Sequence, residues 1–555
     1  MRKMLALLLA IVMVCSLAGC NKPTPTPSQS EQPSTKEEAT KTEPAPSSEP
    51  EPTQEPTPQI QKGGNLNWVY YNKPKTLDPS KDTGFWNYAW TTLAYESPLC
   101  RDTEGNIRPQ VCDFELSDDQ LTLKLWVRDG VTFHDGSPVE IDDVIASIQR
   151  TVHKSPRQYV KPFIKDIQVD KGVATITFTE YNEKTLYYIT CNNPFLAVIP
   201  KEIAEKYSEE SGEFIKTVAD AIGTGPYKFT DFVEGVSVSL ERYEGYVPVK
   251  EGYTGFAAPK NAYLDSITVF ANTDPSTSTL ALLDGQYDLF SDVPSDFDAQ
   301  LKAKGIKSLD KPGSSGAVFY FNTFGKGLAA KNADMRKAIM AAIDVPEFVS
   351  YMTDGKITKG GFCPATDEAY QTDVFSTADY MGEDNVELAK KYLAAAGYNG
   401  EEVQLAFSSA YDNVATLLAN YLKAAGINYK ITMMEAGTVS EFYGDPNNAW
   451  DIYYTNPSMN STPTLLSATL METNYNSPEK DALWKELQTL TVGSKEYMDK
   501  WKELSEKMVD DCAVIFLHMN PIVWSFHPDL HIEYEGSSPY WFNSYWDNPS
   551  EHGKK

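Results

Sequence analysis

Two short patterns in the sequence have residue types and spacings that could perform chemistry. The run SPEK at residues 477–480 satisfies the Ser-x-x-Lys pattern, in which a nucleophilic serine is paired with a lysine. One chance match is expected in a chain of this length, and the polar stretch around it contains a proline, so we expect no catalysis there. His527 and His531 have the i, i+4 spacing of metal ligands on a helix. Pro528 interrupts that helix, so we expect solvated or core histidines and no metal site.

The motifs of the large enzyme classes are absent from the sequence. It has no HExxH zinc motif, no GxSxG nucleophile elbow, no phosphate-binding P-loop and no GxGxxG dinucleotide fingerprint. Carboxylates are too numerous for a glycosidase pair to be identified from sequence. The sequence therefore predicts neither catalytic residues nor a cofactor.

The seven cysteines form no CxxC pair, which excludes a zinc ribbon and a thioredoxin-type motif. Cys100 and Cys112 are close enough in sequence for an extracellular disulfide, and two buried thiols fit as well. The sequence leaves both alternatives open.

Strand, turn and helix signals follow one another in the first half of the chain. Residues 64–71, GNLNWVYY, are typical of a strand, and apolar and polar side chains alternate over residues 121–133. The tripeptide RDG at 128–130 predicts a hairpin turn inside that second segment. We expect a helix to open at the Ser-Pro pair at 137–138 and to run to about residue 150.

The second half has the clearest pattern. Residues 386–396 predict a helix that Gly397 ends, and residues 403–407 predict a strand. A second helical pattern opens at Asp412 and ends at Gly426, before strand-like residues 429–432. This order is a βαβ unit, so we expect an α/β fold with a parallel sheet covered by helices.

Length and charge limit the class of protein. The chain has 555 residues and a formal net charge of −28, enough for several domain-sized units. Such acidity disfavours a phosphate-binding surface, so we expect no nucleic-acid partner. A hydrophobic content of 41% excludes wholesale disorder.

The N-terminus predicts export and a lipid anchor. Arg2 and Lys3 precede an apolar run over residues 4–17, which as a helix would rise only about 21 Å and could not cross a bilayer. The run ends in LAGC at 17–20, which matches the bacterial lipobox. We expect residues 1–19 to be a signal peptide and Cys20 to carry a diacylglyceryl group with palmitate-type chains. The alternative is an ordinary secretory signal with a chance cysteine.

Residues 20–62 are rich in Pro, Thr, Ser and Glu and have no aromatic residue. Such a segment cannot bury enough apolar surface to fold, so we expect a disordered linker. It would hold the remainder of the chain on the extracellular face of the cell membrane.

Several runs together resemble a known signature. LSDDQLT at 116–122, VRDGVTFHDGSP at 127–138 and DDV at 142–144 are similar to the signature of bacterial extracellular solute-binding proteins of family 5. That family comprises the oligopeptide-, dipeptide- and nickel-binding components of ABC importers. Further runs that match the family in order are LDP at 77–79, YE at 95–96, GTGPY at 223–227, LLDGQYD at 282–288, FNT at 321–323, MRKAI at 335–339, AID at 342–344 and AKKYLAAAGY at 389–398.

The resemblance, which covers about residues 63–546, implies a two-lobed fold of the type II periplasmic-binding-protein class that closes over a ligand. Lobe I would be residues 63–315, with an extra subdomain at about 105–225, and lobe II residues 316–518. Residues 519–548 would return to lobe I and 549–555 would form a tail. Most of the shared residues should hold the fold: His134 through a structural hydrogen bond, Gly223 and Gly225 through backbone conformation, and Arg336 through packing or an ion pair.

The same resemblance suggests two walls of a ligand site. The residues expected to contact the ligand are Tyr71, Trp86, Asn87 and Tyr88 on the first wall, and Trp450, Tyr453, Tyr454, Thr455 and Asn456 on the second. Peptide binders of this family often have an aspartate just before the proline at the second wall, to pair with the peptide's amino terminus. This chain has Asn456 there, which leaves room for an oligosaccharide or another ligand.

The leading hypothesis is a monomeric, lipid-anchored protein that delivers peptides to the permease and ATPase subunits of an ABC importer. The alternatives are an oligosaccharide-binding importer component, a sensor or adhesin on the same scaffold, and a secreted hydrolase.

Overall fold

The computed structural model shows an α/β fold. The residues that it describes are 60–70, 73–80, 88–154, 158–190, 196–208, 211–271, 274–291, 293–353, 355, 370, 374, 378–435, 442–443, 445, 447–457, 463, 475–535 and 538–553. The predicted signal peptide, Cys20 and nearly all of the predicted linker lie outside them, and residues Gln59–Lys555 form one compact unit. No helix among the described residues is long and apolar enough to cross a membrane.

A ten-stranded mixed sheet organises this unit, with the strand order β14-β13-β15-β12-β16-β11-β1-β10-β9-β8. Its strands are β1 Asn65–Tyr70, β8 Tyr227–Val233, β9 Ser237–Arg242, β10 Ser266–Ala271, β11 Leu289–Phe290, β12 Lys307–Phe321, β13 Val403–Ser408, β14 Tyr429–Met434, β15 Ile452–Thr455 and β16 Val514–Phe526.

The predicted βαβ unit is confirmed at one end of this sheet. Strands β13 and β14 pair in parallel with Val403 opposite Tyr429, and α10, Asp412–Ala424, connects them. The preceding helix, α9, spans Val386–Ala396 as expected and ends at Gly397, which has a left-handed φ of 70°. At the other end β1 pairs in parallel with β10 over its whole length, which confirms the strand expected near residues 64–71.

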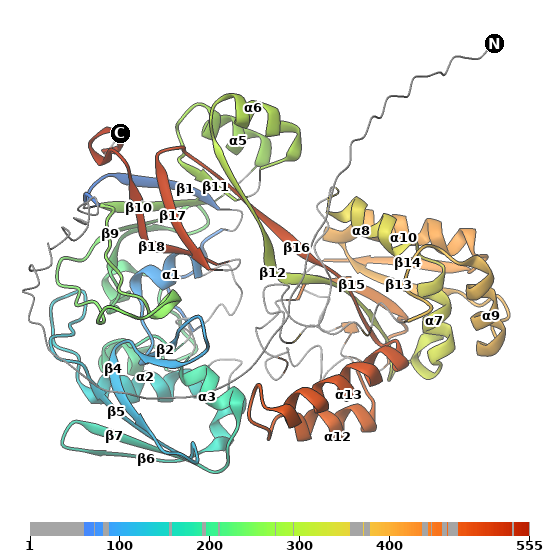
Figure 1. The fold of residues 1–555 in the computed structure, drawn as a ribbon, viewed down its shortest axis with the longest axis horizontal. Coiled ribbons are helices and arrows are strands. Elements are labelled where there is room, and N and C mark those ends of the chain that lie inside the picture. The colour runs from blue at the N-terminus through green and yellow to red at the C-terminus, as the bar shows by residue number, and fades with distance from the viewer. Residues whose placement is uncertain are drawn as a thin grey trace, which may run out of the picture. The chain divides into compact units, whose positions relative to one another are not determined.

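Two long antiparallel strands connect the two ends of the sheet. Strands β12 and β16 pair with Lys307 opposite Phe526 at one end and Tyr320 opposite Val514 at the other (Figure 1). The register shifts between Pro312 and Gly316, and beyond the shift Gly316 lies opposite Met519. The lobe boundaries expected at 315/316 and 518/519 fall at this position and stay a prediction.

A separate antiparallel sheet has the order β4-β5-β7-β6 and packs against α2, Ile141–Lys154. Its strands are β4 Cys112–Leu116, β5 Thr122–Val127, β6 Ile164–Asp170 and β7 Val173–Phe178.

Two predictions for this region are wrong: the hairpin turn at 128–130 and the start of α2. The RDG turn at 128–130 does not join two paired strands, because β5 pairs with β4 and β7 instead. Helix α2 begins at Ile141 and not at the Ser-Pro pair, because residues 137–139 pair back onto 131–133: Phe133 N donates to Ser137 O at 2.9 Å and Val139 N to Val131 O at 3.2 Å.

The remaining elements are short strands and helices around these sheets. The strands are β2 Leu99–Arg101, β3 Ile107–Pro109, β17 Leu530–Glu535 and β18 Ser538–Trp546. The α-helices are α1 Tyr88–Ala94, α3 Glu183–Ile189, α4 Lys201–Lys206, α5 Pro275–Leu283, α6 Asp298–Ala303, α7 Ala333–Ala341, α8 Val345–Met352, α12 Pro478–Leu487 and α13 Lys495–Asp511. Short 3-10 helices are η2 Gln158–Phe163, η4 Val218–Asp220, η5 Gly255–Ala257, η6 Ser295–Phe297, η7 Ala329–Lys331, η10 Ser409–Tyr411 and η14 Pro549–His552.

The side chains of β12 alternate between two hydrophobic cores, one on each face of the sheet. Phe319 and Phe321 join a core formed with α7 to α10, whereas Val318 and Tyr320 join a core formed with α12 and α13. Successive side chains of a strand point to opposite faces, so one strand serves both cores. Helices therefore cover both faces of this end of the sheet, as the βαβ pattern predicts.

The cysteine question has a definite answer. Cys100 and Cys112 are free, buried thiols and not a disulfide. Burial raises the pKa of the Cys100 thiol to about 12, so it stays protonated and unreactive at neutral pH.

Candidate functional site

The predicted second wall lies on and around β15. This strand pairs with β12, with Tyr453 opposite Tyr320 and Tyr454 opposite Phe319. Trp450, Tyr453 and Tyr454 are only 0%, 3% and 2% exposed. The structure therefore buries all three aromatic side chains but divides them between two cores, with Trp450 and Tyr453 in one and Tyr454 in the other. Their contact with a ligand stays a prediction.

Neighbouring tyrosines of β15 pack on opposite faces of the sheet. The Tyr453 ring stacks on Tyr443 at a centroid distance of 3.8 Å and on Tyr320 at 4.9 Å. The Tyr454 ring makes an edge contact with Tyr411 at 5.0 Å. Tyr443 and Tyr411 were missed by the sequence reasoning, because both lie outside the run at 450–457 that was compared with the family.

A buried carboxylate fixes the start of β15. Asp451 is 0% exposed. It accepts the N–H of Ala329 through Oδ1 and the N–H of Gln404 through Oδ2, both at 2.7 Å. Burial raises the pKa of Asp451, and these backbone N–H groups oppose the rise. An aspartate beside the apolar strand IYYT could have signalled such a role, because a buried carboxylate needs hydrogen-bond donors.

The two remaining residues of this wall, Thr455 and Asn456, are half-buried at the end of β15. Asn456 Nδ2 donates to the Tyr411 hydroxyl at 3.4 Å. Within the part of the chain that the structure describes, no hydrogen-bond partner reaches the buried Oδ1 of Asn456. One polar atom of this amide is thus available for a further hydrogen bond.

The end of β15 lies beside the two long connecting strands. Gly316 N of β12 donates to Pro457 O at 3.1 Å. In the same region Asn520 Nδ2 of β16 donates to Ser315 Oγ at 3.1 Å. A group that bound at Asn456 would therefore lie next to the position where β12 and β16 change register.

The predicted first wall falls almost wholly outside the described residues. Tyr71, Trp86 and Asn87 lie outside them, and Tyr88 begins α1 without a described side chain. The role of these four residues in binding stays a prediction.

His134 holds two backbone segments together, as expected. Its Nδ1 accepts the N–H of Gly223 and its Nε2 contacts Gly225 O, both at 3.1 Å. Because Nδ1 accepts, Nε2 carries the proton of a neutral ring. Burial lowers the pKa of His134 to about 4, so the ring stays neutral through physiological pH.

Acidification is expected to destabilise the folded protein in part by protonating His134. Below its ordinary value of 6.5 an unfolded histidine binds a proton, whereas the folded ring does so only near its pKa of about 4. The free energy of unfolding should therefore fall between pH 6.5 and 4 by about 3 kcal/mol from this group. His134→Gln should be less stable at pH 7 by about 1–3 kcal/mol and should lose this part of the pH dependence. Urea denaturation of both proteins at pH 6.5 and at pH 4 measures this fall in the free energy of unfolding. An unchanged pH dependence in the variant would contradict the assignment.

Gly223 and Gly225 serve the fold, but not through their backbone conformation as expected. A Cβ on Gly223 would lie 2.2 Å from Ala94 O, and one on Gly225 would lie 2.5 Å from Leu93 O. These glycines are needed because the end of α1 packs directly on their backbone, and not because of a left-handed φ.

Arg336 has the expected packing role in the first turn of α7. Its Nε donates to Asp511 O at 2.8 Å and its Nη1 to Ala329 O at 2.6 Å. The guanidinium thereby joins the end of α13 to η7, through carbonyl groups.

Two buried ion pairs involve other residues of the family signature. Asp78 Oδ2 lies 2.5 Å from Arg150 Nη2, and Glu96 Oε1 lies 2.7 Å from Lys260 Nζ. All four side chains are at most 3% exposed. These signature carboxylates therefore serve the fold.

The two patterns that could have done chemistry have structural explanations. Ser477 is the N-cap of α12, and its side chain accepts the N–H of Lys480. His527 follows β16, and His531 lies in β17, so no helix contains both, as expected from Pro528. His531 Nε2 lies 2.8 Å from Asp547 Oδ1.

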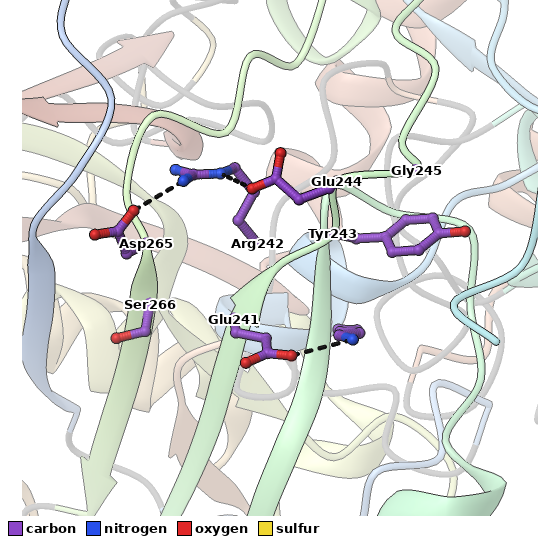
Figure 2. Close-up of a pocket in the computed structure, with 8 residues that line it drawn as sticks. Glu241, Arg242, Tyr243, Glu244, Gly245, Asp265 and Ser266 are labelled. Atoms are coloured by element: carbon purple, nitrogen blue, oxygen red, sulfur yellow. Dashed lines mark hydrogen bonds and ion pairs between the residues drawn. The ribbon is translucent and has the colours of Figure 1, made fainter. Parts of the chain in front are cut away.

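A charged pocket of about 570 Å³ lies at the ends of β9 and β10 (Figure 2). Arg242 contacts Glu244 and Asp265, both at 2.8 Å, and Lys228 contacts Glu241 at 3.1 Å. The lining residues are Lys228, Glu241, Arg242, Tyr243, Glu244, Gly245, Asp265 and Ser266. Its basic side chains are paired within the wall, which is typical of a structural ion-pair group and not of an anion site.

Comparisons with known proteins identify the family and the fold of the chain. The model of the bacterial extracellular solute-binding proteins, family 5, matches residues 106–477. A probable peptide ABC transporter periplasmic-binding protein of Sinorhizobium fredii is 25% identical over 82% of this chain and 85% of its own. Among solved structures, the substrate-binding protein CtaP of Listeria monocytogenes is similar with a TM-score of 0.71 and 22% identity, over 88% of this chain and 100% of its own. The oligopeptide-binding protein AppA of Bacillus subtilis, solved with a nonapeptide, has a TM-score of 0.69 and 19% identity over the same shares.

The fold is that of a type II periplasmic binding protein. The chain belongs to the bacterial extracellular solute-binding proteins of family 5. Proteins of this family are solute-binding components of ABC importers and not enzymes, so the hydrolase alternative is excluded.

Proposed function

We propose that this protein captures peptides outside the cell and delivers them to the permease of an ABC importer. The Sinorhizobium relative is named for peptides, and the Bacillus protein of the same fold was solved with a nonapeptide. The cargo class rests on these likenesses together with the geometry at the end of β15.

The observation that carries the proposal is the position of Asn456. Among the described residues, no hydrogen-bond partner reaches Oδ1 of its amide, which lies beside the register shift of β12 and β16. Peptides offer both N–H donors and carbonyl acceptors, either of which an amide side chain can bind. A ligand held there contacts the strands that connect the two lobes, so its binding energy can favour a closed state.

Asn456 also indicates how the ligand is recognised. A neutral amide forms a hydrogen bond with a peptide amine but no ion pair, and a carboxylate in this position would form both. We infer that this protein discriminates weakly between peptides with free and with blocked amino termini.

Asn456→Asp should therefore change specificity in one direction. Affinity for a free-amine peptide should rise about tenfold, or by about 1.4 kcal/mol, because the carboxylate adds an ion pair to the hydrogen bond with the ammonium group. The N-acetylated form of the same peptide should gain nothing. Isothermal titration calorimetry with both peptides measures the effect. Asn399→Asp adds the same charge at an exposed position and should change neither affinity; an equal gain for the acetylated peptide would contradict amine recognition.

The cargo class itself is tested by thermal shift with peptides of two to nine residues and with oligosaccharides. We expect peptides to raise the melting temperature saturably and to be recovered intact. Stabilisation by oligosaccharides alone would replace the peptide assignment with a sugar one. Stabilisation by neither class would overturn the proposal.

We also propose that Cys20 carries the lipid anchor and that residues 20–62 act as the tether on the extracellular face. The protein would work as a monomer, since one chain contains both proposed walls. A sensor on the same scaffold would bind the same ligands without delivering them.

A further inference from the structure

We propose that His527, Asp529 and His552 form a binding site for one divalent transition-metal ion, separate from the proposed peptide site. Each of these residues can offer one ligand atom, and the three atoms lie within 4.8 Å of one another. The i, i+4 spacing in the sequence pairs His527 with His531. In the structure, the histidine that shares the site with His527 is His552, in η14.

The three side chains come from two segments that the fold places side by side. His527 and Asp529 lie in the turn between β16 and β17. The two histidine rings are 5.1 Å apart between centroids, at an angle of 72°. Asp547 N donates to Asp529 O at 3.0 Å, which joins this turn to the chain that leads into η14.

Both histidines are oriented before a metal arrives. The His552 ring stacks on Trp546 at 3.6 Å, and Trp546 Nε1 donates to Asn65 O at 3.1 Å. His527 Nδ1 accepts the N–H of Asp529 at 3.2 Å and lies 4.0 Å from Asp529 Oδ2. Its lone pair therefore faces Asp529, and a metal ion would take the place of that N–H.

The donor set selects the kind of ion. Two imidazole nitrogens and one carboxylate oxygen suit Zn²⁺, Co²⁺, Ni²⁺ or Cu²⁺, whereas Ca²⁺ and Mg²⁺ prefer oxygen donors. The His527 and Asp529 side chains are 32% and 41% exposed, so an ion can enter and retain water in its open positions. Ligand atoms around Zn²⁺ lie about 2.0–2.2 Å from the metal, so small side-chain rotations must bring the three together.

An ion at this site would tie the C-terminal segment to the end of a connecting strand. His527 directly follows β16, and its N–H donates to Asp288 O at 2.8 Å. Metal binding should therefore stabilise the folded chain by mass action, whether or not a peptide is bound.

Zn²⁺ titration of the chelator-treated full chain by calorimetry tests the site. We expect one saturable site per chain, a rise in melting temperature, and visible absorption bands when Co²⁺ replaces Zn²⁺. His527→Gln, Asp529→Asn and His552→Gln should each weaken Zn²⁺ binding at least tenfold. His531→Gln removes a nearby histidine that is not part of the site, and should bind Zn²⁺ like the unmodified chain.

Absence of saturable Zn²⁺ binding, or unchanged affinity in all three ligand variants, would overturn the site. Melting of the three variants without metal separates a loss of ligands from a loss of folding. Asn456→Asp should leave Zn²⁺ affinity unchanged, so the metal site and the peptide site can fail independently.

Discussion

Asp451→Ala is expected to lower the free energy of unfolding by about 2–5 kcal/mol and to weaken ligand binding. The buried carboxylate is the acceptor for the N–H groups of Ala329 and Gln404, each at 2.7 Å. Each buried N–H left without an acceptor costs about 1–3 kcal/mol. The loss should reach the proposed site, because Asp451 directly precedes β15 and sets the position of the residues after it.

Urea denaturation measures the stability, and calorimetry with a bound peptide measures the affinity. The matched control is Asp445→Ala. Asp445 also accepts a backbone N–H, that of Asn447 at 2.9 Å, but it is exposed. Its loss should change stability by no more than about 0.5 kcal/mol. A similar small effect at Asp451 would show that water replaces the carboxylate, and would remove Asp451 as the anchor of β15.

Lys260→Met is expected to lower the free energy of unfolding by about 3–5 kcal/mol. Lys260 Nζ lies 2.7 Å from Glu96 Oε1, and the two side chains are 3% and 1% exposed. Removing one partner leaves the other charge buried without compensation. The Tyr246 hydroxyl would still donate to Glu96 at 2.9 Å, but a neutral donor does not replace the lost charge.

The double variant Glu96→Gln, Lys260→Met should recover part of this loss, because it leaves no buried charge. The exposed pair Lys216–Glu234, at 3.0 Å, is the control, and Lys216→Met should cost no more than about 1 kcal/mol. If the double variant were less stable than Lys260→Met alone, the uncompensated charge would not be the cause. Urea denaturation of all four proteins gives the comparison.

Elements with a strong local signal could be predicted from the sequence. The helix Val386–Ala396 and the strands around it have apolar periodicity and glycine ends that fix their limits locally. The start of α2 was misplaced because residues 137–139 pair with the neighbouring residues 131–133, and this local pairing competes with the helix signal of the Ser-Pro pair. The RDG turn was assigned to the wrong pair of strands for a different reason: β5 pairs with β4 and with β7, and β7 is distant in the chain.

Less of the candidate site than of the fold could be predicted from the sequence. The resemblance identified residues 450–456 as a segment of interest, but three of its aromatic side chains are in the core. Tyr411 and Tyr443 approach β15 from other parts of the chain, and no local pattern marks them. The metal ligands His527 and His552 likewise belong to different segments.

The sequence by itself determined the family, the α/β class and the expectation of an exported, tethered protein, because these depend on local periodicity, composition and short motifs. Only the tertiary structure decided which side chains meet: Asp451 with the backbone of two other segments, Glu96 with Lys260, and His527 with His552. The physical reason is that the energy of these contacts comes from burial and from partners distant in the chain. Such partners are adjacent only after the sheets and helices have packed.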